Sequence, residues 1–109
     1  MKPMEWMGDS LARLREFPRP AMREAGHQLE LVQDGREPKD WKPMSTIGTG
    51  VNELRVRAGG AFRVIYVAKF AEAVYVLHAF EKKSRRTALL DIELARSRYR
   101  NLIQTRRPQ

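Results

Sequence analysis

The hydrophobic and polar positions of the chain follow two different periods, one in each half. Within residues 20–33 the apolar side chains recur three and four positions apart, which is typical of an amphipathic helix. Residues 51–57 alternate between polar and apolar side chains, which is typical of a strand with one buried face. The pattern therefore predicts helices first and strands afterwards.

The first half of the chain predicts a short strand and two helices. A strand is expected over residues 2–7, where large and polar side chains alternate. Asp9 or Ser10 can cap a first helix, and the prolines at 18 and 20 separate it from a second one. Gly35 suits the residue just beyond the end of that second helix. Its apolar stripe consists of Met22, Ala25, Leu29 and Val32.

Residues 36–50 show no clean period and contain two prolines and two glycines. We therefore expect a long loop, and long ordered loops are usually functional or fixed by a large side chain. Trp41 is the expected anchor, covering an open edge of the core, and the alternative is a platform on which a base stacks.

The second half predicts a three-stranded meander and a last helix. The strands are expected over residues 51–57, 61–69 and 74–80, with a hairpin at Ala58-Gly59-Gly60. A basic connector, residues 82–86, leads to a helix capped by Thr87. Its apolar stripe is Ala88, Ile92, Ala95, Tyr99 and Leu102. The expected fold is a single α+β domain over residues 1–109, in the order β-α-α-β-β-β-α, with helices packed on one face of a largely antiparallel four-stranded sheet.

Charge is divided unevenly between the two halves. Residues 1–50 carry eight Lys/Arg and eight Asp/Glu, whereas residues 51–109 carry thirteen and five, so the whole net charge of +8 lies after residue 50. Such asymmetry indicates a polyanionic partner, most often nucleic acid, and the alternative is a basic surface that aids solubility. The chain has no cysteine, which excludes disulfides, thiol catalysis and zinc-thiolate sites.

Neither a leader nor a membrane span is expected. Lys2, Glu5 and Asp9 interrupt any apolar run near the start, and Lys69 and Glu72 interrupt the most apolar stretch. We expect a soluble, cytoplasmic protein that does not contact a membrane. With two histidines and no nucleotide-binding glycine loop, we expect no metal and no cofactor.

The candidate chemistry lies in cations on or beside the strands. Arg63 is the sharpest candidate because a charge in the middle of a strand is costly unless it is paired or faces a site. The alternatives are an ion pair with Glu53 or Glu81 and an exposed edge position. We expect Arg63→Ala to leave the fold intact or slightly more stable. The cations that could bind phosphate and stabilise its charge are Arg55, Arg57, Arg63, Lys82, Lys83, Arg85 and Arg86.

Other side chains have two open interpretations. His78 shares a face with Phe80 and could act as acid or base, or it could be a buried histidine bonded to a backbone group. Phe80 and Tyr66 could stack on a base, although aromatic residues in mid-strand are more often core.

His27 is expected on the surface. Tyr99 is expected to pack, and Arg106-Arg107 is expected to form a mobile tail.

Three segments in order resemble the RelE/HigB superfamily of toxins, and in particular its phage-derived HigB-like branch. They are Asn52-Glu53-Leu54-Arg55-Val56, Phe62-Arg63-Val64-Ile65-Tyr66-Val67-Ala68 and Leu77-His78-Ala79-Phe80-Glu81-Lys82-Lys83. The resemblance covers nearly the whole chain. One departure is that Thr87 is followed by Ala88-Leu89-Leu90, where the family commonly has proline and then an acid.

The resemblance implies a RelE-like fold and a ribosome-dependent mRNA endonuclease. Such toxins enter the ribosomal A site, contact mRNA and ribosomal RNA, and promote attack of a ribose 2′-OH on the adjacent phosphate without a metal. It also implies inhibition by a cognate helix-turn-helix antitoxin. By position, Arg55 and Arg63 match strand arginines that hold the scissile phosphate, Lys82 and Lys83 match a basic pair that contacts RNA, and His78 matches a histidine of the same motif. The predicted catalytic residues are therefore Arg55, Arg63, His78 and Lys82. The predicted RNA-binding residues are Lys83 and, from their charge or aromatic ring, Arg57, Phe80, Arg85 and Arg86.

Two other functions remain compatible with the sequence. ParE-type toxins share this fold and bind DNA gyrase without nuclease chemistry. An inactive phage-derived module that binds RNA or protein is the second alternative.

Overall fold

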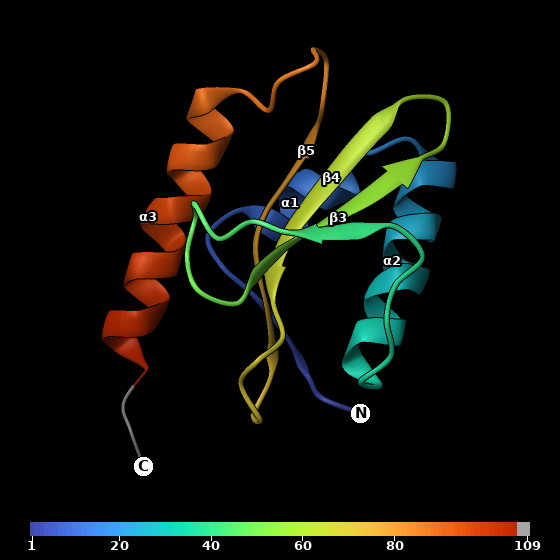
Figure 1. Cartoon of the computed structure of the whole chain (residues 1–109). Helices are drawn as coiled ribbons and strands as arrows, with labels where there is room; N and C mark the ends of the chain where they lie inside the picture. The colour runs from blue at the N-terminus through green and yellow to red at the C-terminus, as the bar shows by residue number, and fades with distance from the viewer. Residues whose placement is uncertain (107–109) are drawn as a thin grey trace.

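A five-stranded sheet forms the middle layer of the protein, and helices cover both of its faces (Figure 1). The computed structural model describes residues 1–106. Along the chain the elements are β1 (Met4–Trp6), α1 (Ser10–Arg15), α2 (Arg19–Gln33), β2 (Trp41–Pro43), β3 (Val51–Arg57), β4 (Ala61–Val67), β5 (Val74–Glu81) and α3 (Leu89–Thr105). The predicted α+β class is confirmed.

The three predicted consecutive strands form the expected antiparallel meander. The sheet order is β1-β5-β4-β3-β2, with β3 paired to β4 and β4 to β5. Gly59 in the β3–β4 turn has a φ of +73°, which only glycine adopts without strain. Strand β1 pairs with β5 in parallel, so the sheet is mixed.

The prediction of four strands was wrong, because the segment expected to be a loop contains β2. Trp41 to Pro43 pair antiparallel with Leu54 to Asn52 of β3 and form an edge of the sheet. Three residues that include a proline carry no alternation from which a strand could be recognised. The free edge of β3 supplies this pairing. Trp41 is half-buried and lines a surface pocket with Asn52 and Tyr66, and it belongs to neither core cluster among the described residues.

The prediction that all helices lie on one face was also wrong. Helices α1 and α2 pack with Leu54, Val64 and Val76 on one face. Helix α3 packs on the opposite face with Ile65, Val67 and Leu77 (Figure 1). Because β4 is buried on both sides almost throughout, a single helical layer would leave half of its apolar surface in water.

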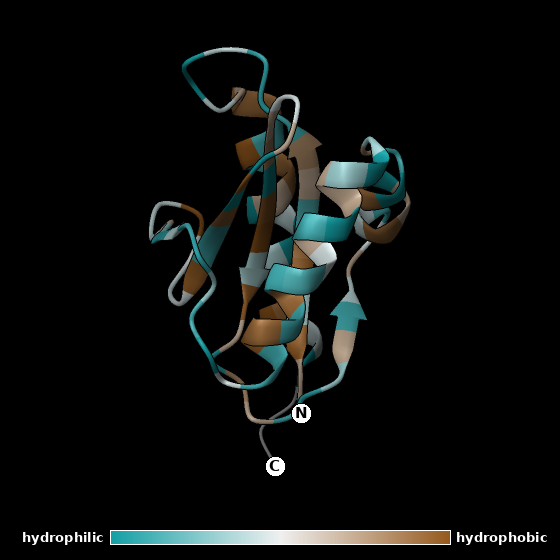
Figure 2. Cartoon of the chain, turned by 90° about the vertical axis from the view of Figure 1, so that its right-hand side faces the viewer, coloured by the Kyte–Doolittle hydropathy of each residue, from teal (hydrophilic) through white to brown (hydrophobic). Residues whose placement is uncertain are grey.

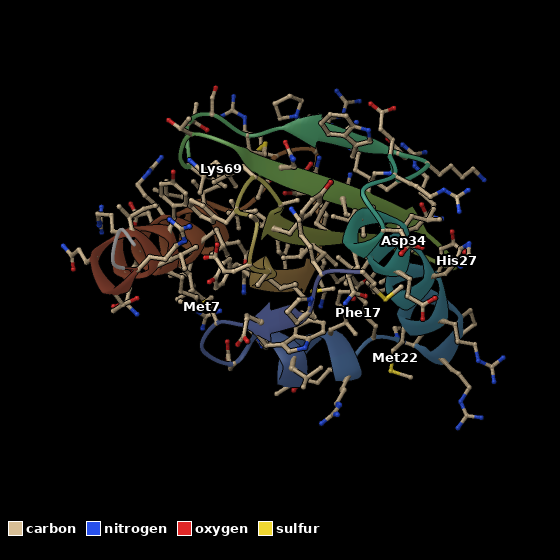
Figure 3. All side chains as sticks on the ribbon, turned by 90° about the horizontal axis from the view of Figure 1, so that it is seen from below. Met7, Phe17, Met22, His27, Asp34 and Lys69 are labelled. Carbon is tan, nitrogen blue, oxygen red and sulfur yellow. The ribbon has the colours of Figure 1, made fainter. Side chains whose placement is uncertain are left out.

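Helix α2 buries the stripe predicted for it except for the half-buried Met22, whereas α3 buries only part of its predicted stripe, since Ile92 and Tyr99 are half-buried and Ala88 is exposed. Helix α2 buries Ala25, Leu29 and Val32, and its outward side is largely hydrophilic (Figure 2). The exposed His27 lies on that outer side, as expected (Figure 3). Helix α3 buries Ala95 and Leu102 and begins at Leu89, with Ala88 rather than Thr87 at its N-cap.

Gly48 is required where the chain passes α3. A Cβ added there would overlap the ring of Tyr99, whose hydroxyl donates to the carbonyl of Thr49 at 2.8 Å and so holds the ring in place. We expect Gly48→Ala to lower the free energy of unfolding by about 2 kcal/mol through overpacking. Gly26 in α2 is the matched control, since a Cβ there meets nothing within 4 Å and Gly26→Ala should stabilise by about 0.5–1 kcal/mol. Urea unfolding of both variants measures this, and equal stability of Gly48→Ala and wild type would contradict it.

No helix within residues 1–106 is both long and apolar enough to cross a bilayer.

Candidate nucleic-acid interface

The β3–β4 hairpin places Arg55 and Arg63 directly opposite each other on the face that carries α3. Two cations in this position would repel each other. Glu53, two residues before Arg55 and therefore on the same face, lies between them. Its Oε1 is 3.3 Å from Nε of Arg55 and 3.5 Å from Nε of Arg63. One carboxylate thus holds two guanidinium groups side by side.

The Arg63 end of this cluster is nearly closed to solvent. Arg63 is only 5% exposed and Glu53 is fully buried, whereas Arg55 is partly exposed. Burial lowers the pKa of the Arg63 guanidinium, and the Glu53 carboxylate opposes that shift. Nη1 of Arg63 donates to the carbonyl of Phe62 at 3.1 Å. The ion pair with Glu53, one of the alternatives raised by the sequence, is present, and no pair with Glu81 forms among the described residues.

Breaking this pair would leave a buried charge without its counter-ion, which costs stability. The expectation that Arg63→Ala leaves the protein intact or more stable is therefore corrected to a loss of stability.

Five of the predicted cations line one open hollow of ≈ 750 Å³ at the end of the sheet. They come from two separate segments, the β3–β4 hairpin and the connector between β5 and α3. The backbone N–H of Lys82 donates to the carbonyl of Ala61 at 2.7 Å, which fixes the start of the connector against the hairpin. The lining cations are Arg57, Arg63, Lys82, Lys83 and Arg85. Arg55 adjoins them through Glu53, and Arg86 is exposed on the connector.

His78 lies outside the hollow and is completely buried. Its Nε2 is 2.7 Å from Oδ1 of Asp91 in the first turn of α3, and its Nδ1 has no hydrogen-bond partner among residues 1–106. Burial lowers the pKa of His78, while the hydrogen bond to Asp91 acts in the opposite direction. His78 is therefore neutral at pH 7 and bonded to a carboxylate rather than to the backbone. Without exposed surface its ring cannot touch a substrate in this arrangement.

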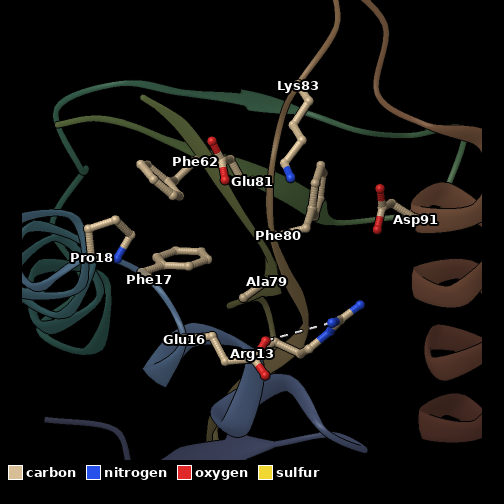
Figure 4. A pocket seen from close by; sticks show the side chains of 10 residues that line it. All are labelled: Arg13, Glu16, Phe17, Pro18, Phe62, Ala79, Phe80, Glu81, Lys83 and Asp91. Atoms are coloured by element: carbon tan, nitrogen blue, oxygen red, sulfur yellow. Dashed lines mark ion pairs between the residues drawn. The ribbon is translucent and has the colours of Figure 1, made fainter. Parts of the chain in front are cut away.

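Phe80 is similarly placed for packing rather than for contact with a base. Its ring stacks on His78 at 5.2 Å between centroids, and the residue is 7% exposed. A second, narrower cleft of ≈ 370 Å³ lies beside it, between α1, the end of β5 and the start of α3 (Figure 4). Lys83 lines both this cleft and the cationic hollow. Tyr66 is also core, and burial raises its pKa to about 12.

The family model for phage-derived protein Gp49-like (DUF891) matches residues 12–100. The chain belongs to this family. Gp49-like proteins are a RelE/HigB-like toxin family, so the resemblance to that superfamily is confirmed. The match includes all of the candidate cations and His78. No curated protein matches the chain.

Sequence reasoning did not place three charged residues of this Gp49-like protein in or beside the candidate site. Glu53 was considered only as an ion-pair partner that would explain the charge of Arg63 without a function. Its position two residues before Arg55 on a strand already indicated that the two side chains share a face of the sheet. Asp91 is the acid in the first turn of α3, and a buried histidine needs such a partner. Arg98 was assigned no role, and it donates to the carbonyl of Leu77 at 2.9 Å and pairs with Asp9.

The prediction of a mobile tail was wrong for Arg106, and Arg107 lies outside the described residues. The Arg106 guanidinium forms an ion pair with Glu72 and lies 3.7 Å from the ring centroid of Phe70. The ion pair holds the pKa of Glu72 down at about 2. Tyr99 packs as predicted. Within the described part of this Gp49-like protein, no cluster of three or more histidines and carboxylates could hold a metal ion.

The buried His78 makes the stability of this Gp49-like protein depend on pH. Its pKa is lower in the folded than in the unfolded protein, where it is near 6.5, so the unfolded state binds the extra proton first. The free energy of unfolding should therefore fall as the pH drops below about 6.5, by at most about 1.4 kcal/mol per pH unit. His78→Gln should remove this slope between pH 7 and pH 5, and His27→Gln on the surface should retain it. An unchanged slope in His78→Gln, measured by urea unfolding, would contradict the assignment.

Proposed function

We propose that this protein is the toxin of a type II toxin-antitoxin system and, as in the HigB-like branch, a ribosome-dependent mRNA endoribonuclease. The observation that carries the proposal is the hollow lined by five cations from two chain segments. Such a convergence suits a polyanion, and its Arg side chains offer planar forks that match phosphate oxygens. Membership of a toxin family supports the same conclusion.

In the proposed reaction the ribose 2′-oxygen bonds to the adjacent phosphorus while the bond to the 5′-oxygen breaks. The products are a 2′,3′-cyclic phosphate and a 5′-hydroxyl. One proton leaves the 2′-hydroxyl and one reaches the departing 5′-oxygen, so no metal, cofactor or oxidant is needed for the balance. Arg55 and Arg63 stabilise the charge that develops on the phosphate oxygens.

The positions of Lys82 and His78 favour different roles for them. Lys82 is partly exposed and lines the hollow, so it is the proposed group for proton exchange with RNA. His78 is buried and bonded to Asp91, so we propose that it positions the end of β5 and the start of α3. Arg57, Lys83, Arg85 and Arg86 would contact phosphates of mRNA and ribosomal RNA, while Phe80 would contribute through packing. The proposed partners are the ribosomal A site and a helix-turn-helix antitoxin.

The proposal is tested by inducing the protein in bacteria and mapping the ends of cellular mRNA. We expect new ends within translated reading frames and none when translation initiation is blocked. Loss of DNA supercoiling without new mRNA ends would instead support the gyrase-binding alternative. Absence of both effects, with the protein folded and expressed, would support an inactive binding module.

A further inference from the structure

The narrow cleft between α1, β5 and α3 is lined by three carboxylates, and two of them already have a partner (Figure 4). Oδ1 of Asp91 is 2.7 Å from Nε2 of His78. Oε1 of Glu16 is 3.7 Å from Nη1 of Arg13. The third acid, Glu81, is exposed and forms no ion pair with another residue in the range 1–106. Its carboxylate is therefore available to accept hydrogen bonds from a ligand.

Glu81 and Lys83 lie where this cleft meets the cationic hollow. Both line the cleft, whereas Lys82 between them lines only the hollow. Lys83 lines both spaces, and a Cβ added to Gly60, in the hairpin that lines the hollow, would lie 3.5 Å from Oε2 of Glu81. A nucleotide whose phosphate lies in the hollow is therefore placed to extend its base into the cleft.

The cleft suits a neutral, flat group better than a phosphate. Its three carboxylates face only two cations, Arg13 and Lys83, whereas every charged residue that lines the hollow is a cation. Phe17 and the exposed Pro18 form an apolar wall against which a planar ring can lie. Unstacked bases of single-stranded RNA are recognised in this way, by contact with their faces and by hydrogen bonds to their Watson–Crick edges.

One carboxylate beside one ammonium group favours guanine among the four bases. The Watson–Crick edge of guanine carries an acceptor, O6, followed by two donors, N1–H and the N2 amino group. A carboxylate only accepts and an ammonium only donates, so Glu81 matches the two donors and Lys83 matches O6. Adenine and cytosine present one amino group beside an acceptor, and uracil presents one N–H between two carbonyls. Each of these bases turns an acceptor toward the second carboxylate oxygen.

We propose that the cleft binds a guanine base of the RNA, with Glu81 accepting from N1–H and the N2 amino group and Lys83 donating to O6. The ammonium of Lys83 has three N–H donors, so it can contact a neighbouring phosphate at the same time. The proposal rests on the proposed RNA-cleaving function and adds the base that the site selects. It gives Glu81 a role in specificity.

The test measures binding of the whole protein to three fluorescein-labelled tetranucleotides. All carry 2′-deoxyribose, so they cannot be cleaved, and they differ at one position in a uracil background. That position holds guanine, adenine or hypoxanthine, which is guanine without the N2 amino group. By fluorescence anisotropy we expect the guanine ligand to bind at least ~10-fold more tightly than the adenine ligand, the scale of one bidentate contact to a base edge. The hypoxanthine ligand should fall between them, since it keeps O6 and N1–H.

Glu81→Gln should abolish the preference for guanine, because an amide replaces one acceptor oxygen by a donor NH2 group. Glu81 is exposed, so this variant should unfold in urea like the wild type. Glu93→Gln is the matched control, because Glu93 is an exposed acid of α3 that lines neither the cleft nor the hollow. It makes the same change in charge and should keep the full preference.

Several outcomes would overturn the proposal. They are equal binding of the guanine and adenine ligands, tighter binding of adenine, and failure of all three ligands to bind. A preference that persists in Glu81→Gln, or that Glu93→Gln loses to the same extent, would also reject the assignment of Glu81.

The mapped mRNA ends score the nuclease separately. A protein that selects the guanine ligand but cuts no mRNA would retain the guanine site and reject the nuclease. A protein that cuts mRNA but binds the three ligands equally would retain the nuclease and reject the guanine site.

Discussion

Arg63→Lys should lower mRNA cleavage by at least ~10²-fold while the protein stays folded. Lysine keeps a positive charge beside Glu53, so the buried pair survives. It lacks the planar fork that can donate two hydrogen bonds to a phosphate, and removal of one preorganised donor typically costs ~10²–10³ in rate. The measurement is the rate at which mRNA ends appear after induction, with protein amounts matched by blotting and stability checked by urea unfolding.

Two further variants separate chemistry from structure at this position. Arg23→Ala removes an exposed arginine from α2, on the other face of the sheet, and should leave cleavage unchanged. Arg63→Ala should be inactive as well, but part of its loss reflects a damaged fold. A fully active Arg63→Lys beside an inactive and unstable Arg63→Ala would assign Arg63 to stability alone.

Glu53→Ala should lower the free energy of unfolding by about 3 kcal/mol. The substitution leaves the Arg63 guanidinium buried with no carboxylate beside it, and breaking one side of a buried pair costs ~3–5 kcal/mol. Arg55→Ala should cost about 1 kcal/mol or less, because the Arg55 side chain is partly exposed and solvent screens its interaction with Glu53. Urea unfolding at pH 7 compares the two variants.

Replacing both buried partners distinguishes a stability role from a functional one. Glu53→Leu/Arg63→Met should recover most of the stability lost in Glu53→Ala, since apolar side chains of similar size remove both desolvated charges. The same double variant should still fail to cut mRNA, because no guanidinium remains opposite Arg55. Recovery of both stability and cleavage would show that the pair only holds the sheet together.

The secondary structure could be predicted largely from local patterns. The meander and α2 bury most of the residues that their periods selected, such as Leu54 and Val56 in β3 and Leu29 in α2, while α3 buries only part of its predicted stripe. Two features depended on distant partners and were missed. Strand β2 exists because β3 offers a free edge, and α3 lies on the far face because β4 is apolar on both sides. Neither relationship is contained in a window of neighbouring residues.

The candidate site shows the same division. Charge counting and alternation selected Arg57, Arg63, Lys82, Lys83 and Arg85, which the structure brings to one hollow. The same reasoning gave His78 a possible chemical role that its complete burial does not favour. It also missed Asp91, which is thirteen positions further along the chain and meets His78 only when α3 docks on the sheet.

Sequence alone determined the basic second half, the order of the main elements and the list of cations from which a phosphate site can be built. These are properties of neighbouring residues, and they do not depend on the contacts that each segment makes in the folded protein. Only the tertiary structure decided how exposed each charge is and what it faces. Arg63 forms an ion pair with the buried Glu53, and Arg106 forms one with Glu72. Leu89 and Leu90 are exposed to solvent. Burial and pairing set the free energy of a charged group, and both depend on contacts between residues far apart in the chain.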